Sequence, residues 1–376
     1  MNTNSVLILD FKGNVNSQKK DSRLRHETYA QKLSEASSAK PLRLIVISKG
    51  KNFKKEVSGN VSFFEVKSSR ISVIGFILKS LRITKRENLK IAVLVCGDPW
   101  ESFFLGKIFS RINRDKTKIQ VQVHADISDK NWERNRLKNF IRTKLHNYAF
   151  SQADQVRAVS VRIADYVRLR NPNQNVFVTP IPINLEYRSD KSFFKHRDLI
   201  KIGFFGRLHK DRGTESFIDF IRKLDSCRED FSVVVAGRGS EEPRLKSELQ
   251  KLLGHNRVIF LGYLEQPALW RSLNNLDIYF SLAPSESHGL GLRESVIAGV
   301  PVICLDSNGA RDARELFGEN SITIVGASIS PKSLSQKIDS ALDAAPNNDS
   351  YSIQLALNSG YLDTLIDSWL LLAESA

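Results

Sequence analysis

Two glutamates, Glu286 and Glu294, lie eight positions apart in segment 284–302, which reads PSESHGLGLRESVIAGVPV. An apolar stretch at 278–282 predicts a strand that leads into a loop, and a helix is expected to begin near Leu290. Glu286 then lies in the loop and Glu294 on the first turns of the helix, so both can face one cleft. Carboxylates accept hydrogen bonds from pairs of hydroxyl groups, as on a hexose or a ribose. The spacing alone equally fits a polar helix start.

A second segment suited to ligand binding is 204–213, FFGRLHKDRG. A buried strand is predicted to end at Gly206, and Gly213 precedes a predicted helix. Arg207 and Arg212 flank that helix start, where backbone N–H groups, the helix dipole and two cations would bind a phosphate group. A turn with two surface arginines is the alternative interpretation.

A third, weaker indication of ligand binding is the segment Gly237-Arg238-Gly239, which follows the apolar stretch 231–236. Glycines at this place let the backbone approach a ligand closely, although ordinary turn chemistry explains them equally well.

The elements that must position these residues form one alternating strand–helix series in each half of the chain, as expected of doubly wound parallel sheets. In the first half the predicted strands are 6–9, 42–48, 90–95, 119–124, 156–159 and 176–181, and the predicted helices are 24–33, 71–81, 102–112 and 132–150. In the second half the predicted strands are 202–205, 231–236, 258–261, 278–282, 302–305 and 321–325, and the predicted helices are 214–224, 243–253, 266–273 and 290–298.

These series predict an α/β protein with two Rossmann-like domains that face each other across a cleft. The expected divisions are a first domain at 1–190, a second at 191–350 and a helical segment at 351–376 that packs toward the first domain. A polar segment at 185–198 marks the boundary, and a Pro/Asn/Asp-rich break at 345–350 precedes the last helix.

The charge of the chain is unevenly distributed. Residues 1–200 carry 38 Lys/Arg and 18 Asp/Glu, whereas residues 201–376 carry 18 and 23, within a total net charge of +15. Basic character in one half suggests an anionic partner for that half, such as a membrane surface or a phosphate-bearing molecule; a solvated basic surface without a partner is the alternative. Nucleic acid is not expected, because the basic runs match no known reader motif.

Three widely spaced cysteines, Cys96, Cys227 and Cys304, indicate neither a disulfide framework nor a metal site and fit a reducing cytoplasm. The apolar run at 6–9 is expected to be a strand rather than a signal peptide, and the longest apolar stretch, 71–78, is too short to span a bilayer.

The second half resembles the donor-binding domain of family 4 retaining glycosyltransferases (glycosyl transferases group 1), which have the GT-B fold. The family pattern appears in order across most of 200–315, as segment 206–213, Gly237-x-Gly239, the strand VIFLG at 258–262, and segment 284–302. This sequence departs from the pattern at Arg212, where lysine is usual, and at Ser287-His288, where Gly-Phe is usual. The histidine leaves the donor identity open.

The resemblance implies a site in which Arg207 and Arg212 hold the donor diphosphate, Glu286 binds hydroxyls of the transferred sugar and Glu294 binds the ribose. The backbone at Gly289 and Leu290 would position sugar and phosphate. Further donor-binding positions implied by the family are Gly13, Gly206, Gly237, Gly239 and His288. The residues expected to act in catalysis are His124, Glu286, Arg207 and Arg212.

In the first half, His124 ends a predicted strand at a position where the family often has histidine, and it would face the transferred sugar; a structural histidine is the alternative. Asp98, Glu101 and Asp126 are candidates for the acceptor side. No Asp-x-Asp triad and no His/Cys ligand cluster occurs, so no metal and no cofactor is expected. Cations and helix dipoles would then stabilise the departing diphosphate.

The resemblance implies transfer of a hexose-type sugar from a nucleotide-diphosphate donor to a saccharide or lipid-linked saccharide acceptor, in cell-surface polysaccharide or lipopolysaccharide synthesis. The basic first domain would bind the acceptor and contact anionic lipid, which predicts a cytoplasmic enzyme attached to the inner face of the membrane. The alternatives are an enzyme acting on a small phosphorylated acceptor, and a non-catalytic GT-B relative that binds saccharide or membrane.

Overall fold

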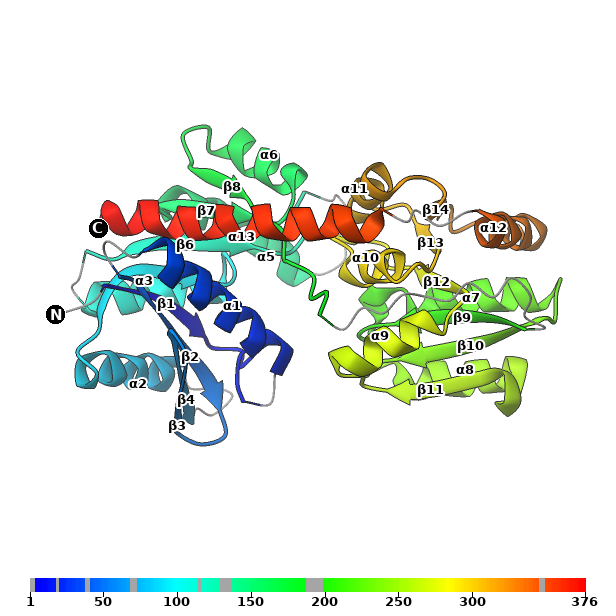
Figure 1. Cartoon of the computed structure of the whole chain (residues 1–376), viewed down its shortest axis with the longest axis horizontal. Helices are drawn as coiled ribbons and strands as arrows, with labels where there is room; N and C mark the ends of the chain where they lie inside the picture. Colours follow the sequence, from blue (N-terminus) through cyan, green and yellow to red (C-terminus); the bar gives the residue numbers. More distant parts are fainter. Residues whose placement is uncertain are drawn as a thin grey trace. The chain divides into compact units, whose positions relative to one another are not determined.

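The computed structural model describes residues 4–17, 20–37, 41–67, 73–113, 116–128, 137–186, 199–344 and 349–376. The chain divides into two compact units, Met1–Pro182 with Ser359–Ala376 and Ile183–Asn358. Each unit has its own sheet covered by helices (Figure 1). Most of the expected linker at 185–198, most of the break at 345–350 and the first part of the helix expected at 132–150 lie outside the described residues.

The first unit is built on an eight-stranded sheet of order β3-β4-β2-β1-β5-β6-β7-β8. All neighbours are parallel except β3, which is antiparallel to β4. Its strands are β1 (Asn4–Asp10), β2 (Arg43–Gly50), β3 (Lys54–Ser58), β4 (Val61–Lys67), β5 (Lys90–Cys96), β6 (Lys118–Val123), β7 (Gln155–Ala158) and β8 (Val176–Val178). Its helices are α1 (Lys20–Ala36), α2 (Val73–Arg86), α3 (Glu101–Asn113), α5 (Leu137–Gln152) and α6 (Val161–Arg170), with the end of α13 (Ser350–Glu374).

The β3–β4 hairpin and α6 were not expected from the sequence. β3 reads KKEVS and is largely exposed, so it lacks the apolar run by which a buried strand is recognised. Gly59, at φ 53°, and Asn60 connect it to β4, and such residues are typical of tight hairpin turns. β3 is thus a short, lysine-containing edge strand, and charges on an edge strand discourage pairing with another chain.

Two apolar clusters cover the two faces of this sheet. One of them includes side chains from the C-terminal half of α13, namely Leu362, Leu365, Ile366, Trp369 and Leu372. Trp369 is fully buried, packs edge-on against Tyr29 of α1 and donates from Nε1 to Oε1 of Gln120 at 2.9 Å. The C-terminal part of α13, from Ser359 onward, is thus part of the core of the first unit.

The second unit is built on a six-stranded parallel sheet of order β11-β10-β9-β12-β13-β14. Its strands are β9 (Ile200–Phe205), β10 (Phe231–Ala236), β11 (Val258–Gly262), β12 (Ile278–Ser281), β13 (Val302–Leu305) and β14 (Ile322–Val325). Its helices are α7 (Thr214–Asp225), α8 (Glu242–Leu253), α9 (Gln266–Asn274), α10 (Leu290–Ile297), α11 (Asn308–Phe317) and α12 (Pro331–Asp343), with short 3₁₀ turns at Lys210–Arg212 and His255–Arg257. Of these, α11 and α12 were not expected.

Both sheets have the doubly wound order in which the chain starts in the middle and reverses direction between two neighbouring strands. The reversal falls between β9 and β12 in the second unit and between β1 and β5 in the first. Ligands of such sheets bind beyond the carboxyl ends of the strands at this switch point. The expectation of two Rossmann-like domains is confirmed, and each domain brings one switch point to its own candidate site.

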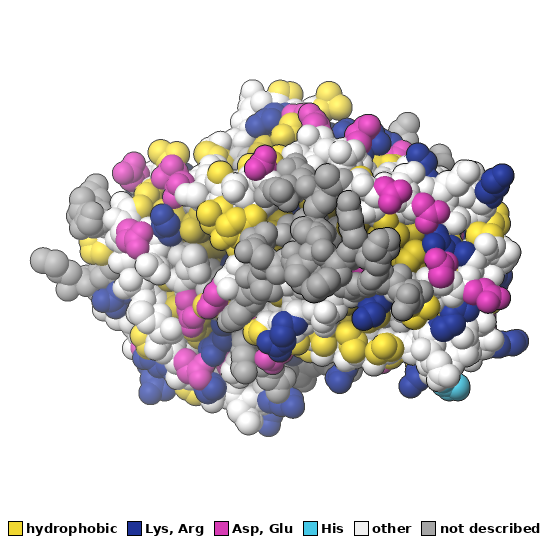
Figure 2. All heavy atoms as spheres, turned by 45° about the vertical axis from the view of Figure 1, so that its right-hand side comes forward, with side chains coloured by type: hydrophobic (Ala, Val, Ile, Leu, Met, Phe, Trp, Pro, Cys, Tyr) yellow, Lys and Arg dark blue, Asp and Glu magenta, His cyan; other side chains and the backbone are white. Residues whose placement is uncertain are grey.

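Basic and acidic side chains are interspersed on the face that Figure 2 shows, with apolar side chains between them. Among the described residues, no helix has both the length and the apolar character needed to cross a bilayer.

Candidate functional site

The candidate site of the second unit is formed by the loops that follow β9, β10 and β12. The loops after β9 and β10 are joined by backbone hydrogen bonds, with Leu208 N donating to Arg238 O and Glu241 N donating to Leu208 O, both at 2.9 Å. The side chains of His209 and Ser240 add a contact of 3.0 Å between His209 Nδ1 and the serine hydroxyl. The carboxyl edge of the sheet is therefore a connected surface rather than a set of independent loops.

Three glycines permit this close packing. A Cβ at Gly213 would lie 1.9 Å from the carbonyl oxygen of Leu282, which ends the β12 side of the switch point. A Cβ at Gly237 would lie 1.7 Å from the carbonyl oxygen of Gly206. A Cβ at Gly239 would lie 2.0 Å from the carbonyl oxygen of Leu208. The absence of a side chain at Gly213, Gly237 and Gly239 thus allows the three loops to pack closely.

Arg212 and Glu286 form an ion pair between the loop after β9 and the loop after β12. Arg212 Nη1 donates to both carboxylate oxygens of Glu286, at 3.2 and 3.3 Å. The side chains keep 33% and 18% of their surface exposed, so the pair is accessible from the carboxyl edge. Arg207 lies on the same loop, and burial together with the nearby Arg212 cation lowers the pKa of its guanidinium. Two neighbouring arginine cations are suited to bind an anion.

The backbone of Glu286 is fixed by the next helix along the chain. Gly309 N, in the first turn of α11, donates to Glu286 O at 2.7 Å, and Ser307 caps that helix by accepting from Ala310 N. A Cβ at Gly309 would lie 2.7 Å from the same carbonyl oxygen. The orientation of Glu286 therefore depends on a helix that the sequence analysis did not predict.

Glu294 lies on α10, which begins at Leu290 after Gly289 has turned the backbone into the left-handed region at φ 70°. Burial raises the pKa of Tyr279, and the nearby charges of Glu294 and Glu286 raise it further. The charges of both carboxylates thus raise the pKa of the same buried phenol on β12. Tyr279 in turn donates to Phe205 O at 2.8 Å, which ties β12 to β9 at the switch point.

His288 stands between the two glutamates in the sequence but points into the protein. Its side chain is only 7% exposed, and its Nε2 has no hydrogen-bond partner among the described residues. Burial, aided by the Arg293 cation, lowers the pKa of His288 to about 3. Arg293 Nε also donates to His288 O at 2.9 Å. The histidine is thus a neutral, buried side chain that shapes the loop from within.

The switch point of the first unit encloses a cavity of about 350 Å³. Lys12, Asp98 and His124 line it, from the ends of β1, β5 and β6. His124 contacts Gln122 Oε1 at 3.1 Å through Nε2, and burial, together with the charges of Arg157 and Arg25, lowers its pKa to about 3. At neutral pH His124 is an uncharged imidazole at the cavity wall.

Of the three acceptor candidates, only Asp98 lines this cavity. It pairs with Lys12 Nζ at 2.7 Å and accepts from the backbone of Trp100 and from Ser102 at the start of α3. Burial alone would raise the pKa of Asp98, but Lys12 and the hydrogen bonds from Ser102 outweigh it and leave the pKa below its usual value. Asp98 is therefore a buried carboxylate held in its charged form.

Glu101 and Asp126 have other partners. Glu101 accepts from Arg142 Nη2 at 2.8 and 3.1 Å. Asp126 is 4% exposed and accepts from the backbone N–H of Ser128 at 3.2 Å, so it holds the turn after β6. Gly13 lies outside the cavity in the turn after β1, with φ 73°, and lines a separate pocket beside β2 and β4.

Sequence reasoning missed three residues that line the cavity, Arg25, His26 and Arg157. Arg157 is 3% exposed, and its guanidinium donates to Thr179 O and Pro180 O at 3.0 and 3.1 Å. Burial lowers the pKa of His26 to about 4 although its ring contacts Ser22 O. The sequence did contain an indication of Arg157, because it is a charged residue within the short buried strand QVRA. Arginine is rarely buried unless its guanidinium group has a partner.

No group of three or more His, Cys, Asp or Glu side chains suited to hold a metal ion occurs in the part of the chain that the structure describes.

Comparisons with known proteins point to one family. The family model "Glycosyl transferases group 1" matches residues 188–354. The lipopolysaccharide core biosynthesis mannosyltransferase LpsB of Rhizobium meliloti is 34% identical over 113 residues, which cover 28% of this chain and 31% of that protein. The chain thus matches less than a third of the length of that relative.

Two solved structures resemble the whole chain. Sucrose-phosphate synthase from Thermosynechococcus elongatus has a TM-score of 0.76 at 14% identity and covers 99% of this chain and 100% of its own. Alr3699/HepE of Anabaena, solved with UDP and glucose, has a TM-score of 0.66 at 15% identity and covers 96% and 98%. At these identities the similarity shows the fold alone, which is GT-B as expected. The family match itself is limited to residues 188–354, less than half of the chain, and the two arginines and two glutamates of the second unit's candidate site lie within it.

Proposed function

We propose that this protein is a retaining glycosyltransferase that moves a hexose-type sugar from a nucleotide-diphosphate donor to a saccharide or lipid-linked saccharide acceptor. The observation that carries the proposal is the Arg212–Glu286 pair at the switch point of the second unit, with Arg207 beside it. The similarity to a lipopolysaccharide core mannosyltransferase supports a role in cell-surface polysaccharide or lipopolysaccharide synthesis.

In this proposal the donor binds to the second unit. Its diphosphate takes the place beside Arg207 and Arg212, where an anion relieves the repulsion between the two guanidinium groups. Glu286 then exchanges its bond with Arg212 for sugar hydroxyls, and Glu294 on α10 accepts from the ribose hydroxyls. Backbone N–H groups at Gly289 and Leu290 complete the site, in the manner of a helix N-terminus.

The acceptor binds to the first unit, at the cavity lined by Asp98 and His124. An imidazole with a pKa near 3 is neutral under physiological conditions, so His124 can exchange hydrogen bonds with sugar hydroxyls without adding charge. Asp98 is charged and fixed by Lys12, which suits it to orient a hydroxyl. Glu101 lies beside it, within 3.8 Å of the same lysine, and Asp126 supports the turn that carries His124.

The sugar transfer proceeds in this proposal by front-face attack of the acceptor hydroxyl, with retention of the anomeric configuration. The bond from the anomeric carbon to the diphosphate oxygen breaks, the acceptor oxygen bonds to the same face of that carbon, and the leaving phosphate takes the acceptor proton. Arg207 and Arg212 stabilise the charge that develops on the leaving diphosphate, and we propose that no metal ion is needed for this.

Association with the inner membrane surface is part of the same proposal. α2 exposes Ile74 and Leu78, at 72% and 49%, beside the exposed cations Lys79 and Arg82. Neighbouring α3 and α5 add further exposed apolar side chains, Ile108, Ile112, Phe140 and Ile141. Apolar side chains flanked by lysine and arginine are suited to the interface of an anionic bilayer.

The proposal is tested by measuring thermal stabilisation with UDP-, GDP- and ADP-sugars, in the wild type and in Glu294→Ala. We expect one donor to raise the melting temperature of the wild type and the effect to be lost in the variant, because a ligand that binds only the folded state stabilises it. Product analysis by NMR then shows whether the anomeric configuration is retained. If no nucleotide sugar binds, the chain is a non-catalytic relative and the proposal is wrong.

A further inference from the structure

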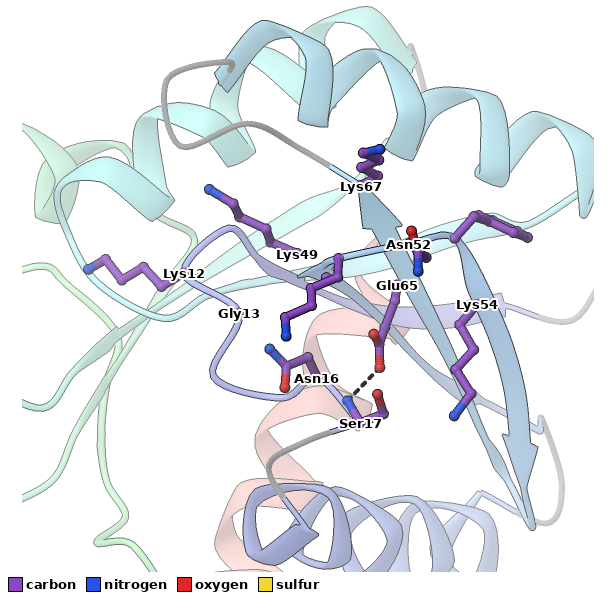
Figure 3. A pocket seen from close by; sticks show the side chains of 12 residues that line it. Lys12, Gly13, Asn16, Ser17, Lys49, Asn52, Lys54, Glu65 and Lys67 are labelled. Atoms are coloured by element: carbon purple, nitrogen blue, oxygen red, sulfur yellow. Dashed lines mark hydrogen bonds between the residues drawn. The ribbon is translucent and has the colours of Figure 1, made fainter. Parts of the chain in front are cut away.

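A second pocket in the first unit has lysine as its most frequent lining residue. It encloses about 660 Å³ and is bordered by five lysines and one carboxylate, together with small polar side chains. Figure 3 shows Glu65 in its middle, directed toward Ser17, with the labelled lysines arranged around it. The lysines that line the pocket are Lys12, Lys49, Lys51, Lys54 and Lys67.

The topology of the sheet explains why lysines distant in sequence meet here. β1, β2 and β4 are parallel neighbours, so their carboxyl ends lie at one edge of the sheet and place Lys12, Lys49 and Lys67 together. β3 runs antiparallel to β4, so its first residue, Lys54, lies at the same edge opposite Glu65. The hairpin that the sequence analysis missed therefore completes the pocket.

The single carboxylate of the pocket already has a structural role. Glu65 is 7% exposed and accepts from the backbone N–H of Ser17, which fixes the turn after β1. A Cβ at Gly50 would lie 2.6 Å from Glu65 Oε2, so β2 also packs directly on this carboxylate. Glu65 thus holds the pocket wall in place and does not balance the charge of all five lysines.

The lysines differ in how they are paired. Lys12 pairs with Asp98, and Lys54 pairs with Glu56. Lys51 and Lys67 are exposed and make no ion pair within the described part of the chain. Like charges gathered at one edge repel one another, and an anion with more than one charge would relieve this repulsion.

The remaining lining residues indicate what kind of anion fits. Asn16, Asn52 and Ser17 offer amide and hydroxyl groups, which exchange hydrogen bonds with the hydroxyls of a sugar. Phe53, at 59% exposed, provides an apolar surface at the same pocket, and aromatic rings pack well against the C–H face of a sugar ring. A volume of about 660 Å³ accommodates a ligand larger than a free phosphate ion.

We infer that this lysine pocket binds the phosphate groups of a phosphorylated saccharide, with Lys51 and Lys67 as its principal phosphate-binding residues. The role of that saccharide as acceptor rests on the proposed transferase function, whereas its binding does not. The pocket adds to the site at Asp98 and His124 a second, phosphate-specific contact in the first unit.

The test is isothermal titration of the full-length protein with glucose 1,6-bisphosphate, and with glucose as the uncharged comparison. The variant is Lys51→Glu/Lys67→Glu, and the matched control is Lys90→Glu/Lys116→Glu, which changes the net charge equally at exposed lysines of the same unit outside the pocket. We expect the bisphosphate to bind, glucose not to bind, the variant to lose at least about tenfold in affinity and the control to keep it.

Binding of the bisphosphate at the donor site is separated by a third protein, Arg207→Ala/Arg212→Ala. Bisphosphate affinity that persists in this protein but falls in the lysine variant supports the pocket, and the reverse pattern overturns it. Equal affinity in the wild type and the lysine variant also overturns it. Nucleotide-sugar binding is measured in parallel and tests the proposed function separately. Only Arg207→Ala/Arg212→Ala is expected to weaken it, whereas Lys51→Glu/Lys67→Glu is not.

A lipid headgroup is distinguished by flotation with vesicles of phosphatidylcholine and phosphatidylglycerol. If Lys51→Glu/Lys67→Glu abolishes flotation while leaving the bisphosphate affinity unchanged, the lysines contact a membrane surface and the inference is wrong. Loss of bisphosphate affinity with flotation retained supports it.

Discussion

Arg212 holds both carboxylate oxygens of Glu286 from a single nitrogen, Nη1, and so joins the loops after β9 and β12. The family resemblance implies that Arg212 binds the donor diphosphate and Glu286 the sugar, and in the structure these two side chains are each other's partners. In the proposed binding mode, the donor breaks or shares the contact between Arg212 and Glu286. Breaking this ion pair costs little free energy, because both side chains are partly exposed to water.

The two members of this pair should respond differently to mutation. Arg212→Ala is expected to weaken binding of the nucleoside diphosphate by about tenfold or more, since a charge-assisted bond to phosphate is lost. Glu286→Gln should leave that affinity nearly unchanged and lower kcat, because it acts on the sugar. Calorimetry with UDP and GDP and turnover assays measure the two effects. Arg244→Ala, on the exposed face of α8, is the control, and equal loss of nucleotide affinity in both site variants would contradict the assignment.

Gly213 should be intolerant of any side chain. Its φ of 79° and the 1.9 Å approach of its ideal Cβ to Leu282 O predict that Gly213→Ala lowers the free energy of unfolding by about 3 kcal/mol. Gly262 also has a positive φ, 65°, but open space around its Cβ position. Gly262→Ala should therefore cost only about 1 kcal/mol. Urea unfolding measures both; similar losses would mean that strain at positive φ, rather than the contact with Leu282, dominates.

The buried neutral state of His288 should make stability depend on pH. Its folded pKa, about 3, lies below the unfolded value of 6.5, so the unfolded chain takes up the proton first. The contribution of the neutral histidine to the free energy of unfolding is then present above the unfolded pKa of 6.5, and it is lost progressively as the pH falls from 6.5 toward 3. Lowering the pH from 7.5 to 5.5 decreases the free energy of unfolding by about 1.4 kcal/mol for one such histidine. His26 and His124, whose pKa values are also lowered, act in the same direction.

Replacing this histidine by an apolar ring tests the effect. His288→Phe should reduce the loss of unfolding free energy between pH 7.5 and 5.5, measured by urea titration at each pH. His255→Gln, at an exposed histidine, should leave it as in the wild type. An unchanged pH dependence in His288→Phe would show that His288 takes up its proton in the folded protein.

Trp369 should matter for the first unit although it lies near the end of the chain. Trp369→Ala removes a fully buried indole and its hydrogen bond to Gln120, and we expect a loss of about 4 kcal/mol in unfolding free energy. Leu371→Ala, on the exposed side of the same helix, should be nearly neutral. Differential scanning calorimetry of both variants makes the comparison, and a small effect of Trp369→Ala would mean that α13 contributes little to the core.

Membrane association should depend on the exposed apolar side chains of α2. Ile74→Ser/Leu78→Ser is expected to abolish flotation on vesicles that contain phosphatidylglycerol, while melting temperature and nucleotide binding stay unchanged. Leu169→Ser, at the exposed surface of α6, is the control. Flotation that survives in the α2 variant, or that never occurs with the wild type at low salt, would contradict the proposal.

Local patterns predicted the two doubly wound sheets, although not the β3–β4 hairpin, α6, α11 and α12. Apolar runs such as 202–205 and 231–236 became parallel strands, and Gly206 and Gly237 marked the turns at the carboxyl ends of these two strands. Strand periodicity and turn chemistry are local properties, which is why they can be read without a structure. The helix α11 was missed because Asn308 and Gly309 suggest a loop, whereas Ser307 caps a helix there.

The partners of the site residues could not be predicted in the same way. The contacts of Arg212 with Glu286 and of Gly309 with Glu286 join segments that lie far apart in the chain. The inward position of His288 and the lysine pocket beside β3 likewise depend on packing and topology. Sequence spacing identified chemically suitable residues, but which of them meet is decided by the sheet order.

The division of α13 between the units has a consequence for synthesis on the ribosome. Residues from Ser359 onward belong to the first unit, so its core lacks Trp369 and its neighbours until the whole second unit has been translated. The second unit is continuous in the chain and can complete its fold first, which reverses the usual N-terminal-first order. A nascent chain released before α13 would expose the apolar face that this helix covers, and would be a natural substrate for chaperones and proteases.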